Sequence, residues 1–189
     1  MDNEAADMVN NMNQIEIWDL YDQNRNLTGQ EHVRGLGPIP DNQYHLVVHV
    51  WLRNSEGKYL IAQRAAHRES NPLMWECQGG SVLKGESSLD GALREVFEEV
   101  GVRLDPQSGT LVFSHIRDVV NGVRFGDIVD VWLFTYDGAA SLGDATTDEV
   151  ADTKWLTADE IKQLYNEGKF VKTLHYFFEK IAKENCQTE

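Results

Sequence analysis

The chain has 189 residues, a length that suits one ordinary domain with a hydrophobic core of its own. Hydrophobic residues make up 41% of the chain and charged residues 25%, which excludes a disordered, collagen-like or disulfide-built protein. The formal net charge of −14 argues against duplex nucleic acid as a partner, because Lys and Arg supply most of the affinity for its phosphates. A small anionic ligand stays compatible with this charge if metal ions mediate its binding.

The start of the chain is predicted to be a flexible tail over 1–13, followed by a single domain over 14–189. The tail is acidic and lacks the basic start and apolar run of a secretory signal. The longest apolar window, 46–52, is too short to span a membrane. Cys77 and Cys186 lie far apart and form no metal-ligand spacing. We therefore expect a cytoplasmic protein with no membrane partner.

The first half of the chain is predicted to form strands. Three segments share alternating apolar positions or a high β-branched and aromatic content: 15–22, 32–35 and 44–54. The turn 55–57 then leads into a hairpin strand over 58–64. After a loop, a short strand is predicted to end at Gly79 and Gly80. These elements predict a mainly antiparallel sheet.

The second half of the chain combines two more strands with two helices. The strands, joined by a turn at 121–122, are predicted over 109–120 and 124–138. The segment 138–150 is predicted to be a polar loop. Thr157 is the expected N-cap of a helix over 158–168, and a last helix is predicted over 169–185. With one charged helix between the strands, the predicted class is α+β with a mixed or antiparallel sheet.

The charged helix is predicted over 88–101, and its two faces differ. At about 100° per residue, one side carries an apolar stripe. The stripe contains Leu89, Leu93, Val96, Phe97 and Val100. On the opposite side, Glu95, Glu98 and Glu99 point into one volume, and Gly91 is expected to leave open space beside them.

The three carboxylates repel one another and need compensation. Like charges at these spacings destabilise a helix by about 0.2–0.5 kcal/mol per pair. Arg94 can pair with only part of the cluster, and Glu86 lies far enough upstream to reach back toward Arg94. Clustered oxygen ligands suit Mg²⁺ or Mn²⁺, although a simple solvated acidic face is the alternative. The glycine-rich loop before the helix favours the metal site, because it exposes backbone beside the carboxylates.

The segment 80–102 resembles the Nudix box, Gx5Ex7REUxEExGU, in which U is an aliphatic residue. The matching positions are Gly80, Glu86, Arg94, Glu95, Val96, Glu98, Glu99, Gly101 and Val102. The resemblance implies a Nudix fold, with a mixed or antiparallel sheet sandwiched by helices (α/β/α) and extra strands at the N-terminus. It also implies a loop-helix-loop that binds divalent cations and hydrolyses a diphosphate linked to another group.

The resemblance implies a role for each matching residue. It implies these metal ligands: Glu95, Glu98, Glu99 and the carbonyl of Gly79. Glu95 resembles a ligand that also orients or deprotonates the attacking water, while Glu86 and Arg94 resemble the pair that braces the helix. The implied cofactor is Mg²⁺ or Mn²⁺, and the implied partner is a small-molecule diphosphate. Self-association as a homodimer is left open.

Four residues outside the box are candidates for substrate contacts or a further ligand. Glu149, with Asp148 as second choice, resembles a carboxylate that Nudix enzymes often add from a late loop. Arg64 and Arg68 precede the box and could contact phosphates, for which the guanidinium geometry is suited. The fourth candidate is His45, which is taken up below with the N-terminal pattern. The alternative for Glu149 and the two arginines is an ordinary surface group, and the alternative for His45, which is expected on a strand, is a satisfied core or surface histidine.

The N-terminal half resembles the branch of the superfamily related to isopentenyl diphosphate isomerase. In that comparison His45 falls on a metal-binding histidine, and Arg64 and Arg68 fall on positions that contact the diphosphate. The catalytic cysteine of the isomerase is replaced by Gly80, and Cys77 is expected on the preceding strand instead. The sequence therefore favours a Nudix pyrophosphohydrolase. The alternatives are an isomerase-like enzyme or a non-catalytic nucleotide-binding module.

Overall fold

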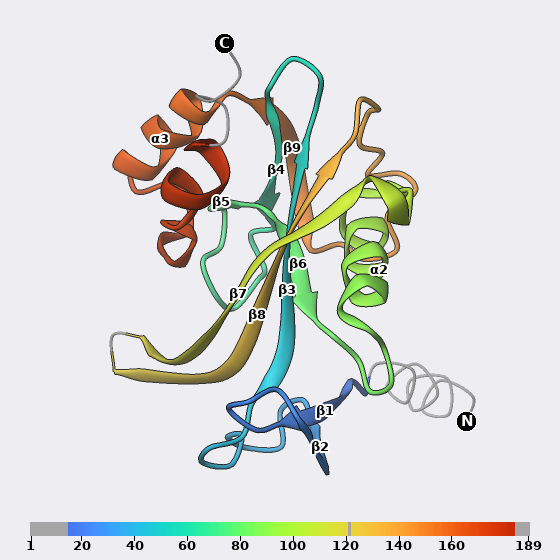
Figure 1. Ribbon diagram of the computed structural model, residues 1–189. Coiled ribbons are helices and arrows are strands. Elements are labelled where there is room, and N and C mark those ends of the chain that lie inside the picture. The colour runs from blue at the N-terminus through green and yellow to red at the C-terminus, as the bar shows by residue number, and fades with distance from the viewer. Residues whose placement is uncertain (1–14, 121, 184–189) are drawn as a thin grey trace, which may run out of the picture.

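The computed structural model describes residues 15–120 and 122–183, and the tail predicted over 1–13 lies outside these ranges. A mixed sheet forms the middle layer (Figure 1), with one long helix on one face and the C-terminal helices on the other. This arrangement confirms the predicted α+β class and its α/β/α layers. Within the described ranges, no helix is long and apolar enough to cross a membrane.

The main sheet has seven strands in the order β5-β4-β3-β8-β7, with β6 paired to β3 and β9 paired to β4. The strands are β3 (His45–Arg53), β4 (Tyr59–Arg64), β5 (Trp75–Glu76), β6 (Gln78–Ser81), β7 (Gly109–Val120), β8 (Val123–Thr135) and β9 (Val150–Leu156). β3 and β8 run parallel, from His45 opposite Asp127 to Arg53 opposite Thr135. The other pairs are antiparallel. The central position of β3 explains its nearly continuous apolar sequence, since both of its faces are covered.

Strand β9 was not predicted. The segment from Val150 to Leu156 has largely exposed or half-buried side chains and no apolar alternation, so its sequence resembles a loop. It becomes a strand by pairing with β4, where Tyr59 lies opposite Leu156. The pairing continues just beyond the strand, because the Ala65 N–H donates to the Glu149 carbonyl at 2.8 Å. The backbone of Glu149 is therefore fixed at the sheet edge.

The helices are α2 (Ser88–Val100) and α3 (Ala158–Asn166), with shorter helical turns η1 (Pro106–Ser108), η2 (Lys172–Leu174) and η3 (Phe177–Ile181). Thr157 caps α3 through a capping box, as predicted. The predicted continuous helix over 169–185 is wrong. Its first residues bond β5 instead, since the Trp75 N–H donates to the Lys169 carbonyl at 2.8 Å and the Val171 N–H to the Trp75 carbonyl at 2.9 Å. Helical geometry can start only after this contact.

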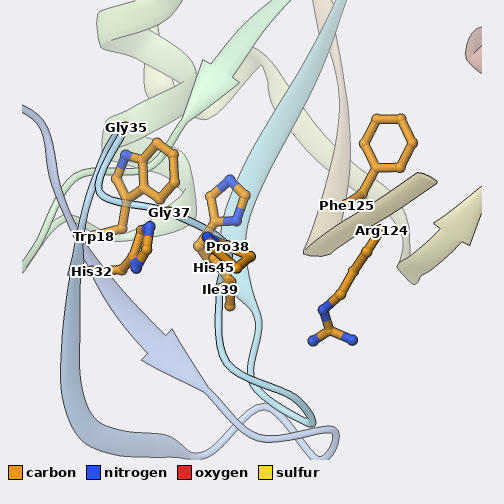
Figure 2. Close-up of a pocket in the computed structure, with 9 residues that line it drawn as sticks. All are labelled: Trp18, His32, Gly35, Gly37, Pro38, Ile39, His45, Arg124 and Phe125. Carbon is orange, nitrogen blue, oxygen red and sulfur yellow. The ribbon is translucent and has the colours of Figure 1, made fainter.

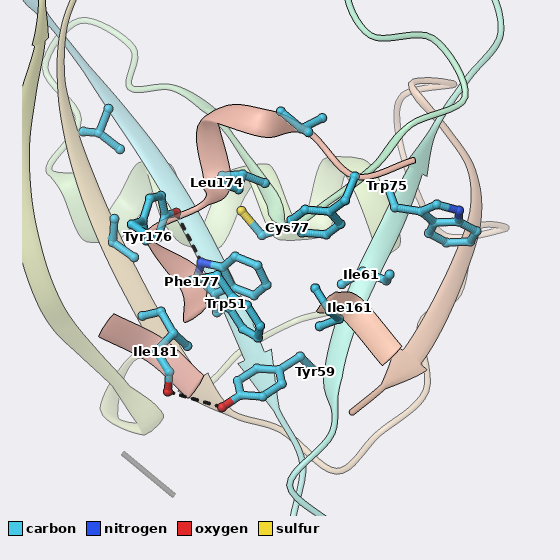
Figure 3. Close-up of a cluster of buried hydrophobic side chains, with 14 of the residues drawn as sticks. Trp51, Tyr59, Ile61, Trp75, Cys77, Ile161, Leu174, Tyr176, Phe177 and Ile181 are labelled. Carbon is cyan, nitrogen blue, oxygen red and sulfur yellow. Dashed lines mark hydrogen bonds between the residues drawn. The ribbon is translucent and has the colours of Figure 1, made fainter. Parts of the chain in front are cut away.

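A hydrophobic core lies on each face of the sheet. On the C-terminal side (Figure 3), Trp51 stacks on Phe177 with ring centroids 4.3 Å apart, and Tyr59 meets the same ring edge-on at 4.9 Å. Cys77 is buried in this core. On the other face, the α2 side chains form the second core with β3 and β8. The sheet thus separates Cys77 from α2.

Helix α2 is fixed at both ends and pressed against the loop that precedes it. Ser87 caps its first turn by a capping box with Asp90, and Gly101 ends it with a φ of 67°. The sequence predicted that Gly91 leaves open space beside the carboxylates, and this prediction is wrong. A Cβ at Gly91 would lie 2.9 Å from Cγ2 of Val82. The missing side chain instead allows close packing of helix and loop.

The predicted extra strands form a separate N-terminal hairpin, β1 (Ile17–Tyr21) and β2 (Leu27–Val33). Tyr21 and Tyr44 exchange two backbone hydrogen bonds, of 2.8 and 2.9 Å, which join the hairpin to the start of β3. Arg25, which lies in the turn between β1 and β2, donates to both carboxylate oxygens of the fully buried Asp130 on β8, with Nη1 2.6 Å from Oδ1. This ion pair anchors the hairpin to the sheet.

The anchoring pair predicts a specific loss of stability. In Arg25→Ala, the buried Asp130 carboxylate keeps its Ser114 hydrogen bond but loses its cationic partner, so we expect the free energy of unfolding to fall by about 2–3 kcal/mol. Urea unfolding followed by fluorescence measures this difference. Lys58→Ala, which breaks an exposed pair with Glu56, is the control and should leave the free energy of unfolding nearly unchanged. Equal losses in both variants would contradict the anchoring role.

Candidate functional site

The box carboxylates face a pocket between β6, α2, the loop before β9 and the N-terminal hairpin. The pocket has a volume of about 120 Å³ and is lined by Glu95, Glu98 and Glu99 beside Gly79 and Gly80. A larger open pocket of about 1060 Å³ shares part of this wall. The geometric prediction that three carboxylates point into one volume is therefore confirmed.

Arg94 holds this acidic cluster together. Its Nε and Nη2 donate to the Glu86 carboxylate at 2.8 and 3.0 Å, and Nη2 also donates to the Ser81 carbonyl at 2.8 Å. Its Nη1 donates to Glu95 and to Glu98, both at 2.9 Å. All five N–H donors of the guanidinium thus have acceptors. The predicted link between Glu86 and Arg94 is confirmed, and it ties the glycine loop to strand β6 and helix α2.

The two glycines are required because backbone and carboxylates approach each other closely. A Cβ at Gly80 would lie 2.6 Å from the carboxylate of Glu95. Gly79 has a φ of 146°, and a Cβ there would lie 2.0 Å from the Val48 carbonyl oxygen. The Gly79 N–H donates to Oε2 of Glu99 at 3.1 Å. The strand end therefore forms the floor of the acidic pocket.

Burial shifts the acid equilibria of two of these carboxylates. Removal from water raises the pKa of Glu95 to about 7, against the opposing effect of Arg94. Burial also raises the pKa of Glu99 well above its usual range, and the charges of Glu95 and Glu76 raise it further. A cation in the pocket would favour the ionised forms of Glu95 and Glu99.

Each of the three carboxylates has one oxygen bonded to the protein and one oxygen without a bond. Oε1 of Glu95 and Oε2 of Glu98 accept from Arg94, and Oε2 of Glu99 accepts from Gly79. Within the described ranges, the second oxygen of each side chain has no hydrogen-bond donor. As they lie in the structure, the described residues contain no group of three or more such side chains close enough together to hold a metal ion.

The donor set nevertheless fits a divalent cation of the hard type. Three carboxylates with unbonded oxygens and a nearby backbone carbonyl, that of Gly79, are the oxygen ligands that Mg²⁺ and Mn²⁺ prefer. A cation would also supply the charge that Arg94 alone does not, because Glu99 is 8% exposed and makes no ion pair with a cationic residue of the described chain. The residues present therefore fit Mg²⁺ or Mn²⁺.

Three of the four candidates outside the box reach the same pocket. Arg64, Arg68 and Glu149 all line it. Arg68 forms an ion pair with Glu149. Arg64 is held more tightly, with Nη1 2.5 Å from the Glu76 carboxylate and Nε 2.8 Å from the Ser70 carbonyl. The unpredicted strand β9 explains why the late loop comes so close to the box.

His45 lies elsewhere. Its ring stacks on Trp18 with centroids 4.2 Å apart and, with His32 and Arg124 among its other neighbours, lines a different pocket of about 240 Å³ (Figure 2). Nδ1 of His45 lies 3.2 Å from the Gly126 carbonyl oxygen, and burial lowers the pKa of the ring. The expected grouping of His45 with the box carboxylates is therefore not found. The reason is the alternation along β3, in which the neighbouring side chain of Leu46 faces the α2 core.

Two residues of the N-terminal hairpin reach the acidic pocket without having been predicted. Glu16 and Arg34 line it together with the box carboxylates and form an ion pair with each other. They are separated from the box by more than 40 residues of sequence and belong to no motif. Only the packing of the hairpin against the loop before α2 brings them there, where the Lys84 N–H donates to the Ile17 carbonyl at 2.8 Å.

An α/β/α fold with a glycine loop and a carboxylate-bearing helix at its acidic pocket defines the Nudix class of proteins. Comparison with known sequences agrees, because the NUDIX domain family matches residues 43–177. The uncharacterized Nudix hydrolase lmo0368 of Listeria monocytogenes is 38% identical over 168 residues, which cover 87% of this chain and 91% of that protein. The chain belongs to the Nudix hydrolase family.

More distant relatives place the chain within a broad superfamily. The isopentenyl-diphosphate Delta-isomerase of Escherichia coli is 28% identical over 117 residues, which cover 61% of this chain and 63% of the isomerase. Among solved structures, DR0079 from Deinococcus radiodurans matches with a TM-score of 0.67 at 21% identity, covering 92% of this chain and all of that one. A MutT protein from Methanosarcina mazei matches with a TM-score of 0.60 at 22% identity, over 76% of this chain and 96% of that one. These structures support the fold.

The role of Arg94 can be tested by replacing its guanidinium. Arg94→Lys keeps one charge but cannot supply five donors in a planar fork, so buried acceptors lose their partners. We expect the free energy of unfolding to fall by about 2–4 kcal/mol in the presence of a chelator, measured by urea unfolding. The control is Arg103→Lys, whose guanidinium lies 3.9 Å from the Phe97 ring centroid and which should lose less than about 1 kcal/mol. A loss no larger than that of the control would refute the bracing role.

The raised pKa of Glu95 predicts a pH-dependent stability difference. Between the ordinary value of 4.5 and about 7, the folded protein holds more of this proton than the unfolded chain, so its contribution to stability is lost as pH rises. Glu95→Gln removes that loss. Without metal, the free energy of unfolding of the variant minus that of the wild type should therefore increase by roughly 1–3 kcal/mol from about pH 5 to about pH 7.5.

Chemical denaturation with a chelator at several pH values measures this difference. Comparing the two proteins at each pH cancels the contributions of the histidines, whose lowered pKa values act with the opposite sign. Glu69→Gln, at an exposed position, gives the baseline for removing one carboxylate. A difference that is independent of pH would mean that Glu95 is not shifted by burial.

Proposed function

We propose that this protein is a Mg²⁺- or Mn²⁺-dependent hydrolase that acts in the cytoplasm and cleaves a diphosphate linkage in a nucleoside diphosphate derivative or related organic pyrophosphate. One observation carries the proposal. Glu95, Glu98 and Glu99 line the same pocket, and each keeps one oxygen without a hydrogen-bond donor among the described residues, while Arg94 and Gly79 bond the other oxygens. A set of this kind suits a cation that is shared with phosphate oxygens.

The proposed ligands of the metal are Glu95, Glu98, Glu99 and the Gly79 carbonyl. When bound, such a metal supplies neutralisation of the diphosphate charge and acidifies water. Arg94 keeps the carboxylates in place through its hydrogen bonds, and the brace it forms with Glu86 fixes the loop. The protein itself thus fixes one oxygen of each of the three proposed carboxylate ligands, through Arg94 and the Gly79 N–H.

Glu95 is the proposed general base. Burial raises its pKa to about 7 in the protein without metal, and a cation in the pocket would favour the ionised form that can accept a proton from water. Its unbonded oxygen is the proposed proton acceptor. Glu149 is proposed as a further carboxylate at the pocket, while Arg64 and Arg68 are proposed to contact the phosphates.

The isomerase alternative gains no support from the site. Cys77 is 5% exposed in the core on the opposite face of the sheet from α2, and burial raises the pKa of its thiol well above its ordinary value. His45 lines a different pocket from the box carboxylates. Neither the thiol of Cys77 nor the ring of His45 therefore lies beside the proposed metal ligands.

The test is turnover of a panel of compounds with Mg²⁺, with Mn²⁺ and with a chelator. The panel contains ADP-ribose, dinucleoside polyphosphates, coenzyme A, nucleoside triphosphates and isopentenyl diphosphate, with phosphate products and allylic isomers measured separately. We expect metal-dependent hydrolysis of at least one compound and a loss of about 100-fold or more in kcat/KM for Glu98→Gln. Glu69→Gln should keep the wild-type rate.

Three outcomes would count against the proposal. Full activity of Glu98→Gln would remove the box carboxylate from the chemistry. An allylic isomer as the product would favour the isomerase. Tight calorimetric binding of a nucleotide without turnover of any compound would favour a non-catalytic binding module.

A further inference from the structure

The N-terminal hairpin supplies an arginine to the acidic pocket. Arg34 follows strand β2 directly and its backbone N–H donates to the Glu16 carbonyl at 3.0 Å, so the two residues lie side by side. Both side chains line the pocket of Glu95 and Glu98. The match to the NUDIX domain family starts at residue 43, so Glu16 and Arg34 lie outside the part of the chain that the family defines.

The arginines of this pocket differ in how firmly they are held. Arg94 uses all five donors, and Arg64 is 15% exposed and bonded to Glu76 and Ser70. The Arg34 side chain is 51% exposed and pairs with Glu16 through Nη1. Within the described ranges, its Nε and Nη2 have no side-chain or backbone acceptor. Arg34 therefore has donors to offer to a ligand.

The ion pair between Arg34 and Glu16 is easily exchanged. Both side chains are in contact with solvent, at 51% and 33% exposure, and pairs of that kind contribute little to stability. A phosphate group offers the guanidinium a charged acceptor with several oxygens, which suits its planar fork. When a phosphate group lies within reach, Arg34 should therefore bind the phosphate in place of the solvent-exposed Glu16 carboxylate.

We infer that Arg34 binds a phosphate group of the substrate, and that Glu16 holds Arg34 beside the pocket until the phosphate replaces it. This inference rests on the proposed function, since it needs a diphosphate at the box carboxylates. It adds a substrate-binding residue from the N-terminal hairpin, which lies outside residues 43–177 that match the family. Glu16 acts here as a positioning residue that competes with the phosphate for Arg34.

The first measurement is calorimetric binding of inorganic pyrophosphate in the presence of Mg²⁺, with steady-state kinetics on whichever panel compound is hydrolysed. For Arg34→Ala we expect pyrophosphate affinity to fall about tenfold and KM to rise by a similar factor, with kcat within about threefold of wild type. The pyrophosphate affinity and KM of Arg34→Lys should lie between those of the wild type and of Arg34→Ala, because lysine keeps the positive charge but lacks the planar guanidinium group. Arg103→Ala removes the same charge at an exposed position and should match the wild type.

The second measurement tests the competition between Glu16 and phosphate. Glu16→Gln removes the competing charge, so pyrophosphate affinity should rise and KM should fall. In the double variant with Arg34→Ala, most of that gain should disappear, because the competition acts through Arg34. Thermal unfolding of every variant shows whether the hairpin stays folded.

The outcomes separate the inference from the proposed function. If the wild type hydrolyses a diphosphate and Arg34→Ala keeps the wild-type KM and pyrophosphate affinity, the inference fails while the proposed function stands. If Arg34→Ala lowers kcat and the melting temperature without changing pyrophosphate affinity, Arg34 is a structural residue and the inference also fails. If the wild type hydrolyses no compound of the panel, the proposed function itself fails.

Discussion

The structure of the site depends on one guanidinium group. Arg94 makes hydrogen bonds to the carbonyl of Ser81 on β6, to Glu86 in the loop and to Glu95 and Glu98 on α2. Three elements that would otherwise carry repelling charges or unpaired acceptors are joined at this point. The repulsion between the carboxylates of α2 is thus partly compensated within the protein by Arg94.

The remaining features of the pocket make sense around this group. Glycines at the end of β6 let the backbone lie against the carboxylates, because any Cβ at Gly80 would overlap Glu95. Two ion pairs from outside the box also line the pocket. One joins Arg68 to Glu149, and the other joins Arg34 to Glu16. The acidic centre is therefore bordered by cations that are already paired. A diphosphate with its metal would meet both kinds of charge there.

Much of the fold and of the acidic cluster could be predicted from the sequence, because these features depend on local rules. The period of α2 put Glu95, Glu98 and Glu99 on one side, and the short spacing allowed Glu86 to reach Arg94. Strand β9 could not be predicted, since its half-exposed side chains have no pattern and its partner β4 alone makes it a strand. The last helix was misread for the converse reason, because backbone bonds to β5 override its helical spacing.

The sequence by itself determined which carboxylates α2 brings to the acidic pocket, because the positions of Glu95, Glu98 and Glu99 on one side of a helix follow from their spacing along the chain. Only the tertiary structure decided which distant residues share the pocket. It excluded His45, which the pleat of β3 directs to the other face, and it brought in Arg34 from the N-terminal hairpin. Such contacts depend on sheet register and hairpin packing, which no local spacing encodes.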